Sequence, residues 1–96
     1  NNSANAGYKL DVNGTVRFSD NTDISGSLSV SDASTPAIPT AKVAINSTNK
    51  GFLTPRMTTG QRDLIPSPEE GLEIYNLTTH TKEFWNGTVW KTITTN

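Results

Sequence analysis

The chain has 96 residues, of which 32% are hydrophobic, and its formal net charge is −1 at pH 7. This balance gives no electrostatic signature for nucleic acid or an anionic membrane surface, and no apolar run is long enough for membrane insertion. Because the chain has no cysteine, disulfides cannot supplement its sparse apolar content, and oligomerisation is the expected source of stability.

One short phrase recurs along the chain. Residues 12–18 read VNGTVRF and residues 24–30 read ISGSLSV, so the two copies start twelve residues apart. A related phrase, WNGTVW, occupies residues 85–90. Strand–turn–strand units that are too small to bury their own apolar face are typical of stacked or intertwined β-assemblies. The repeat therefore favours a structural fibre over a self-sufficient enzyme.

Residues 1–31 are predicted to form a repeat-containing β stalk. Apolar and polar side chains alternate over residues 8–12, which is the pattern of a half-buried strand. Asn13 and Gly14 then give a strong turn signal, because both tolerate positive φ. We expect the apolar stripe of this stalk to be completed by other copies of the chain. The predicted trimer core consists of Leu10, Val12, Val16, Phe18, Ile24, Leu28 and Val30.

Residues 32–42 are predicted to be a linker. They contain two prolines and only one large apolar side chain, Ile38, and proline cannot donate to a strand ladder. Residues 43–96 carry more of the large side chains and are predicted to form a small β-rich knob. Within the knob, residues 72–76 are expected to be a strand.

One short helix is expected near residues 59–65. Thr58 and Gln61 have the spacing of a capping box, in which each side chain accepts a hydrogen bond from the other residue's backbone N–H. Pro66 and Pro68 follow, and proline ends a helix because it has no N–H to donate. The predicted helix is therefore about two turns long.

A C-terminal hairpin is expected over residues 82–93, with its turn at Asn86 and Gly87. A two-residue turn there places Trp85 and Trp90 diagonally on one face of the hairpin. Large apolar side chains also fall on the opposite face. We therefore expect both faces to be covered, by another module or by another chain.

The residues that carry chemistry are few and scattered. His80 is the only histidine, and no nucleophile or carboxylate is placed by a motif to work with it. With no cysteine and one histidine, a transition-metal site within one chain is disfavoured. The sequence predicts no enzyme activity, no catalytic residue and no cofactor. Turn chemistry is the preferred interpretation of the four Asn-x-Ser/Thr sites, at Asn13, Asn46, Asn76 and Asn86.

The aromatic residues of the knob allow two interpretations. Trp85, Trp90 and Tyr75 are possible glycan-contact residues, because flat aromatic rings stack on the apolar face of a sugar. The competing interpretation, which we favour, is that these rings are core or subunit-contact residues.

Two segments resemble phage fibre proteins. Residues 7–19 (GYKLDVNGTVRFS) are similar to a phrase found in phage tail-fibre stalks and in related bacterial surface proteins. Residues 43–75, which include GFLTPRMTTGQRD, and the later FWNGTVW at 84–90 resemble a longer and more specific module. The family is that of fibre and appendage proteins, of tail-fibre or head-fibre type, from phages of Bacteroidetes, including crAss-like phages. A departure is Thr54, where that module usually has a proline.

The resemblance implies an elongated, homotrimeric appendage on a virion. The predicted fold class is mainly all-β, with a trimeric β stalk followed by a small β-rich knob that has one short helix. The expected partners are two further copies of the chain, other virion or fibre proteins and, for host attachment and receptor binding, a host-surface glycan. Two alternatives stay open, a carbohydrate-binding module and an appendage of the Bacteroidetes cell surface or of an injection system.

Overall fold

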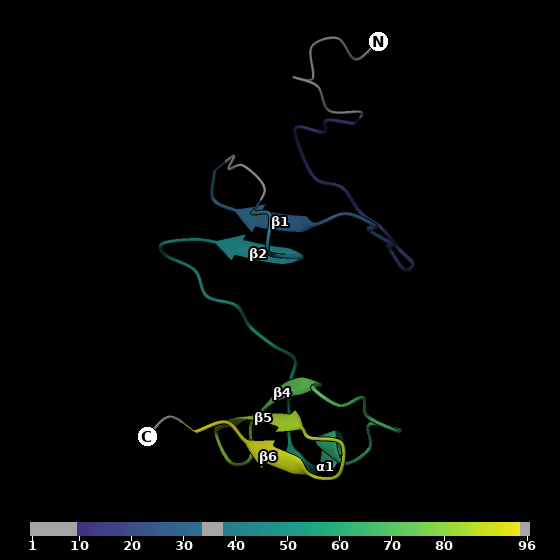
Figure 1. Cartoon of the computed structure of the whole chain (residues 1–96), viewed down its shortest axis with the longest axis vertical. Helices are drawn as coiled ribbons and strands as arrows, with labels where there is room; N and C mark the ends of the chain where they lie inside the picture. The colour runs from purple at the N-terminus through teal and green to yellow at the C-terminus, as the bar shows by residue number, and fades with distance from the viewer. Residues whose placement is uncertain (1–9, 34–37, 95–96) are drawn as a thin grey trace. The chain divides into compact units, whose positions relative to one another are not determined.

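A computed structural model describes residues 10–33 and 38–94 of the chain. Its contacts divide the chain into two units, which adjoin in sequence at Asn46 and Ser47. Each unit has its own sheet, as Figure 1 shows. The structure is mainly β with one short helix, which confirms the predicted fold class at that level. In the described part of the chain, no helix has the length and apolar character needed to cross a membrane.

The first unit contains a two-stranded parallel sheet. Strand β1 (Leu28–Ser31) ends the second repeat copy, and it pairs with β2 (Val43–Asn46). The backbone N–H of Leu28 donates to Lys42 at 2.8 Å, so the pairing extends beyond the strand itself. The predicted linker, residues 32–42, is thus the connection between two parallel strands, and β2 belongs to the same unit as β1.

The turn predicted at Asn13 and Gly14 does not join two strands. Among residues 10–27 the structure has no strand, so the strands expected on either side of this turn are absent from the single chain there. Residues 8 and 9 of the expected first strand lie outside the described residues. A strand is held by hydrogen bonds to a neighbour, and within this chain no described segment pairs with residues 10–27.

The second unit is a four-stranded mixed sheet with strand order β3-β4-β5-β6. Its strands are β3 (Arg56–Met57), β4 (Glu73–Asn76), β5 (Thr81–Trp85) and β6 (Trp90–Thr92). Figure 1 labels β4, β5, β6 and helix α1 of this unit. The pair β3–β4 is parallel, and the other two pairs are antiparallel. Parallel neighbours need a crossover, which here contains α1.

Helix α1 (Thr59–Arg62) begins with the predicted capping box. The Thr58 N–H donates to the Gln61 side chain at 2.9 Å, and the Gln61 N–H donates to the Thr58 hydroxyl at 3.2 Å. The helix confirms the predicted element near 59–65, but it is shorter than the predicted two turns because it ends at Arg62. Leu64 and Ile65 continue in tighter i→i+3 turns, with bonds of 3.1 Å to Gln61 and Arg62.

The C-terminal hairpin is confirmed, but its predicted register is wrong. Trp85 pairs directly with Trp90 rather than diagonally, and a four-residue loop, 86–89, joins the strands. The cause is the Asn86 side chain, whose oxygen accepts the backbone N–H groups of Thr88 and Val89, both at 2.8 Å. Such an Asx turn gives the backbone N–H groups of the loop an acceptor. The loop therefore does not need the two-residue turn that Asn-Gly otherwise favours.

The capping box generates a test of how much local structure holds the second unit. Thr58→Ala removes the side-chain acceptor for the Gln61 N–H, and we expect the free energy of unfolding to fall by about 1 kcal/mol. Urea unfolding followed by circular dichroism measures this loss. Thr88→Ala is the matched control, because Thr88 is exposed and its hydroxyl makes no hydrogen bond within the described residues. Equal effects of the two substitutions would contradict the role of the cap.

Candidate functional site

The predicted trimer-core residues lie exposed in the first unit. All seven are at least 40% exposed, from 40% for Leu28 to 77% for Leu10. Ile24 and Leu28 share a shallow hollow of about 190 Å³ with Val43 of β2. The structure brings these three side chains together, and the remaining predicted core residues do not line that hollow. The single chain thus leaves a series of large apolar side chains uncovered.

The sheet of the second unit has two unlike faces. Ile74, Asn76 and Glu83 point to the face that carries α1, and they are 2%, 0% and 5% exposed. Side chains alternate along a strand, so Tyr75 and Lys82, which pair with each other, lie on the opposite face. We call these the helix face and the open face. Within the single chain only the helix face is covered; covering of the other face by another chain stays a prediction.

Asn76 is the centre of a polar cluster on the helix face. Its side-chain N–H₂ group donates to Thr59 at 2.9 Å and to both carboxylate oxygens of Glu83 at 3.2 Å. Its side-chain oxygen accepts the backbone N–H of Thr78 at 2.8 Å. No buried side-chain polar atom among the described residues lacks a partner. Full satisfaction matters here because an unpaired buried polar group is costly.

Glu83 links this cluster to the helix through Arg62. One Arg62 guanidinium nitrogen lies 2.8 Å from a Glu83 carboxylate oxygen, and the two side chains are only 17% and 6% exposed. Burial by itself favours the neutral acid, but the hydrogen bonds from Arg62 and Asn76 outweigh it and lower the pKa of Glu83. Burial likewise opposes the charge on Arg62, and its bonds to Glu83 and Asp63 more than compensate, so its pKa is raised. Both groups are therefore ionised at neutral pH.

The three possible glycan-contact residues do not share one surface. The rings of Trp85 and Trp90 meet edge to face, with centroids 5.5 Å apart and planes at 67°. The Arg62 guanidinium lies over Trp90 at 5.5 Å. Both indoles are therefore half-buried on the helix face, whereas Tyr75 lies on the open face. The structure brings the two Trp residues together and separates Tyr75 from them.

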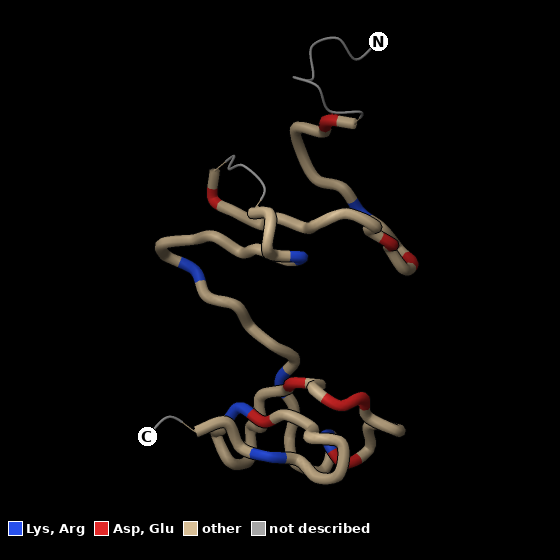
Figure 2. The backbone as a smooth tube through the Cα atoms, viewed as in Figure 1, with Lys and Arg blue, Asp and Glu red and all other residues tan. Residues whose placement is uncertain are grey.

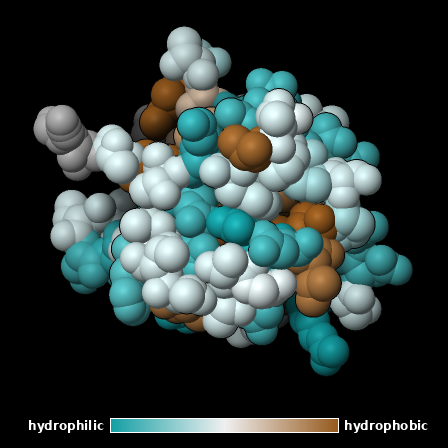
Figure 3. All heavy atoms as spheres, turned by 90° about the horizontal axis from the view of Figure 1, so that it is seen from below, coloured by the Kyte–Doolittle hydropathy of each residue, from teal (hydrophilic) through white to brown (hydrophobic). Residues whose placement is uncertain are grey.

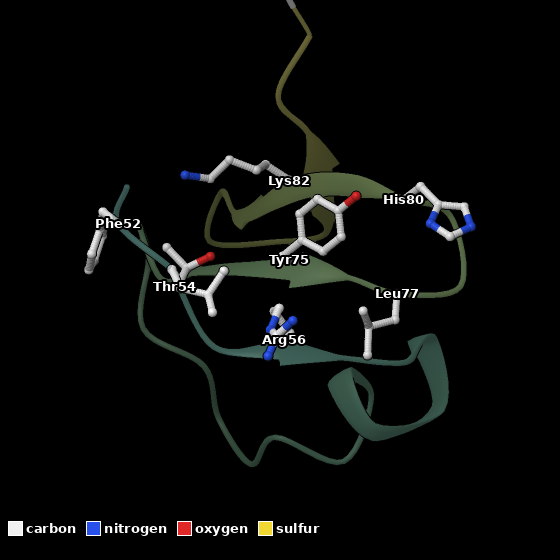
Figure 4. Close-up of a pocket in the computed structure, with 8 residues that line it drawn as sticks. Phe52, Thr54, Arg56, Tyr75, Leu77, His80 and Lys82 are labelled. Carbon is white, nitrogen blue, oxygen red and sulfur yellow. The ribbon is translucent and has the colours of Figure 1, made fainter. Parts of the chain in front are cut away.

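A broad hollow of about 470 Å³ lies on the open face. Arg56, Tyr75 and Lys82 form one row across β3, β4 and β5. Phe52 and Leu77 contribute further lining residues, and Figure 4 shows these side chains spread over one face of the ribbon. The row places an aromatic ring between two cations. Sequence reasoning missed this hollow, although the alternation of residues 73–76 could have separated Tyr75 from its buried neighbours.

The metal-ligating types of side chain are not grouped in the described part of the chain. No group of three or more metal-ligating side chains occurs there. His80 is an exposed turn residue with a φ of 60°, and its backbone N–H donates to Asn76 at 2.8 Å. Charged residues of both signs are interspersed along the tube in Figure 2. Apolar side chains reach the surface in separate patches in Figure 3.

The Asn-x-Ser/Thr site at Asn76 cannot accept a glycan in this fold, because its side chain is completely buried. Asn86 has the turn role that the sequence favours, since its side chain accepts two backbone N–H groups. Asn13 and Asn46 are exposed. Asn76 and Asn86 thus have structural roles.

Comparison with known proteins gives one match. Residues 30–96 fit the model of a family described as phage tail like trimerisation region. The matched segment begins in β1 and includes the whole of the second unit. No curated protein and no solved structure matched the chain.

Two carboxylates of the sheet, the buried Glu83 and the exposed Glu73, give a matched test of the buried cluster. Glu83→Ala leaves Arg62 without its buried partner and Asn76 without its two carboxylate acceptors, and we expect a loss of about 3 kcal/mol in the free energy of unfolding. Glu73→Ala removes an exposed carboxylate that lies 3.8 Å from Lys82, and we expect a loss of about 0–1 kcal/mol. Denaturant unfolding measures both. Similar losses for the two variants would show that the cluster is not a major contributor.

The lowered pKa of Glu83 also predicts how stability depends on pH. Its folded pKa lies below the ordinary value of 4.5, so its contribution is complete above that value. The contribution is lost as the pH falls through the lower, folded pKa. In a pH series of unfolding free energies from 7 to 2, we expect Glu83→Gln to fall less steeply in this acid window than the wild type. Parallel curves for the two proteins would be inconsistent with a Glu83 that is charged in the folded state.

Proposed function

The chain belongs to the phage tail like trimerisation region family, and from this membership we propose that it is a structural segment of a trimeric phage fibre. The observation that carries the proposal is the match over residues 30–96. Family membership supports self-association of a phage tail-type protein. We further propose that the chain is part of a fibre and that it contributes to host attachment.

The exposed apolar residues of the first unit support a fibre made by several chains. Leu10 and Phe18 are 77% and 68% exposed, and burying such side chains contributes roughly 1.5–3 kcal/mol each. Segment 10–27 has no strand partner among the described residues of its own chain. We therefore place the seven predicted core residues against a shared axis, where three copies give one another the missing neighbours.

The structure offers less support for a carbohydrate-binding module. The predicted aromatic platform is divided between the two faces of the sheet. The Trp85 ring packs against Trp90, and the Arg62 guanidinium lies over the Trp90 ring. A bacterial cell-surface or injection-system appendage shares the physics of a trimeric fibre. We favour the virion because the family is a phage tail-type family.

The mass of the full chain in solution tests the proposal. A trimer has about 31 kDa, three times the chain's 10.4 kDa, and multi-angle light scattering resolves it from a monomer. We expect the trimer at micromolar concentration. A compact, stable monomer would contradict the proposal.

The predicted axis generates a mutational test. Val16→Asp places a carboxylate in the apolar stripe, and because an unpaired buried charge is costly, we expect assembly to weaken by about tenfold or more. Thr15→Asp is the control at the neighbouring exposed position. Sedimentation equilibrium gives the association constants. Equal weakening by both substitutions would argue against a shared axis at Val16.

A further inference from the structure

We infer that the open face of the second unit's sheet is a subunit interface, and that its occupant is a second copy of this chain. The inference rests on the proposed trimer and goes beyond it, because it selects one surface of the knob. The predicted axis involves only the first unit. The family match, in contrast, includes every residue from Ser47 to Asn96.

The two faces of the sheet differ in what remains to be covered. On the helix face, α1 and the cluster of Arg62, Asn76 and Glu83 already occupy the surface. On the open face, the hollow of about 470 Å³ is lined by residues of the sheet and its adjoining loops, and no other described element covers it. Phe52 and Leu53 at this rim are 68% and 67% exposed. An exposed apolar hollow of this kind marks an interaction site.

The side chains of the hollow have the chemistry of an interface centre. Phe52, Leu53 and Leu77 supply apolar surface, and Tyr75 and Arg56 belong to the residue types that anchor protein–protein contacts. A tyrosine ring beside two cations accepts both apolar and acidic groups of a partner. No carboxylate lines the hollow itself. Lys82 lies 3.8 Å from Glu73 of its own chain, whereas Arg56 forms no ion pair with another described residue, so a carboxylate for Arg56 has to come from the partner.

A second copy of the chain supplies that charge. Glu69 and Glu70 are exposed in the loop before β4, outside the Arg62 cluster, and they can face the Arg56 and Lys82 of a neighbour. In a ring of three subunits, each contact joins one patch of a chain to a different patch of the next chain. A groove with one sign of charge and a loop with the other are therefore compatible with a closed trimer.

The small core of the second unit gives a reason for this contact. Ile74 is its only buried hydrophobic residue among those described. Small domains bury too little surface to be stable alone and gain the difference by oligomerisation. The open face is where such additional burial is available, because the helix face is already filled.

Single cysteines test the assignment, since the full chain has none of its own. Leu53→Cys probes the open face, Phe52→Cys is a second probe there, and Leu64→Cys is the matched control. Leu64 lies in the same unit, just after α1, and is 80% exposed. The rate of thiol labelling is measured in the native protein and divided by the rate in urea, which removes intrinsic differences in reactivity.

In the trimer we expect Leu53→Cys and Phe52→Cys to be labelled roughly tenfold more slowly than Leu64→Cys, because the interface excludes the reagent. Equal rates in a protein whose mass is that of a trimer would overturn the inference and leave the proposed function standing. The open face would then be free for another occupant, such as a sugar. A monomeric wild-type chain would overturn both the inference and the proposed function.

Discussion

The ion pair between Arg62 and Glu83 joins the helix of the second unit to its sheet. Its two side chains are nearly removed from water, and Asn76 and Thr81 supply further bonds to the carboxylate. Buried ion pairs contribute little net stability compared with apolar packing, but losing one partner is expensive. The pair therefore specifies where α1 sits. It also determines that the helix face, and not the open face, is closed within one chain.

This arrangement reverses the usual distribution of polar and apolar groups. Thr54, Asn76 and Glu83 are buried, whereas large apolar side chains such as Leu53 and Phe18 are more than 60% exposed. A small monomer gains most of its stability from apolar burial. A chain that uses its interior for a hydrogen-bonded cluster leaves its apolar surface available to neighbours. The chain belongs to a trimerisation family, and we propose that the other copies of the trimer cover that surface.

Local signals predicted much of the second unit. The Thr58–Gln61 spacing located the helix, and the Asn-Gly pair located the hairpin loop. The register failed because the Asn86 side chain caps the loop, and spacing alone does not distinguish a two-residue from a four-residue turn. The buried cluster was not predicted either. Arg62 and Glu83 are 21 positions apart, and their meeting depends on the crossover between β3 and β4.

The first unit shows a different limit of prediction. Alternation over residues 8–12 and the Asn13–Gly14 turn signal indicate strands, but a strand forms only where a partner donates and accepts its hydrogen bonds. In the described part of the first unit, only β1 and β2 have such a partner, and each is the partner of the other. Thr54, where the resembling module usually has proline, lies buried at the start of the second unit. The open face was missed because it becomes visible only when the sheet order is known.

The central claim is that contacts between chains complete the stability of this protein. Thermal unfolding over a hundredfold range of protein concentration tests it most directly, because association of folded chains makes the midpoint depend on concentration. The account predicts a midpoint that rises steadily with concentration. A midpoint that stays constant over that range, in a protein that remains folded at the lowest concentration, would contradict it.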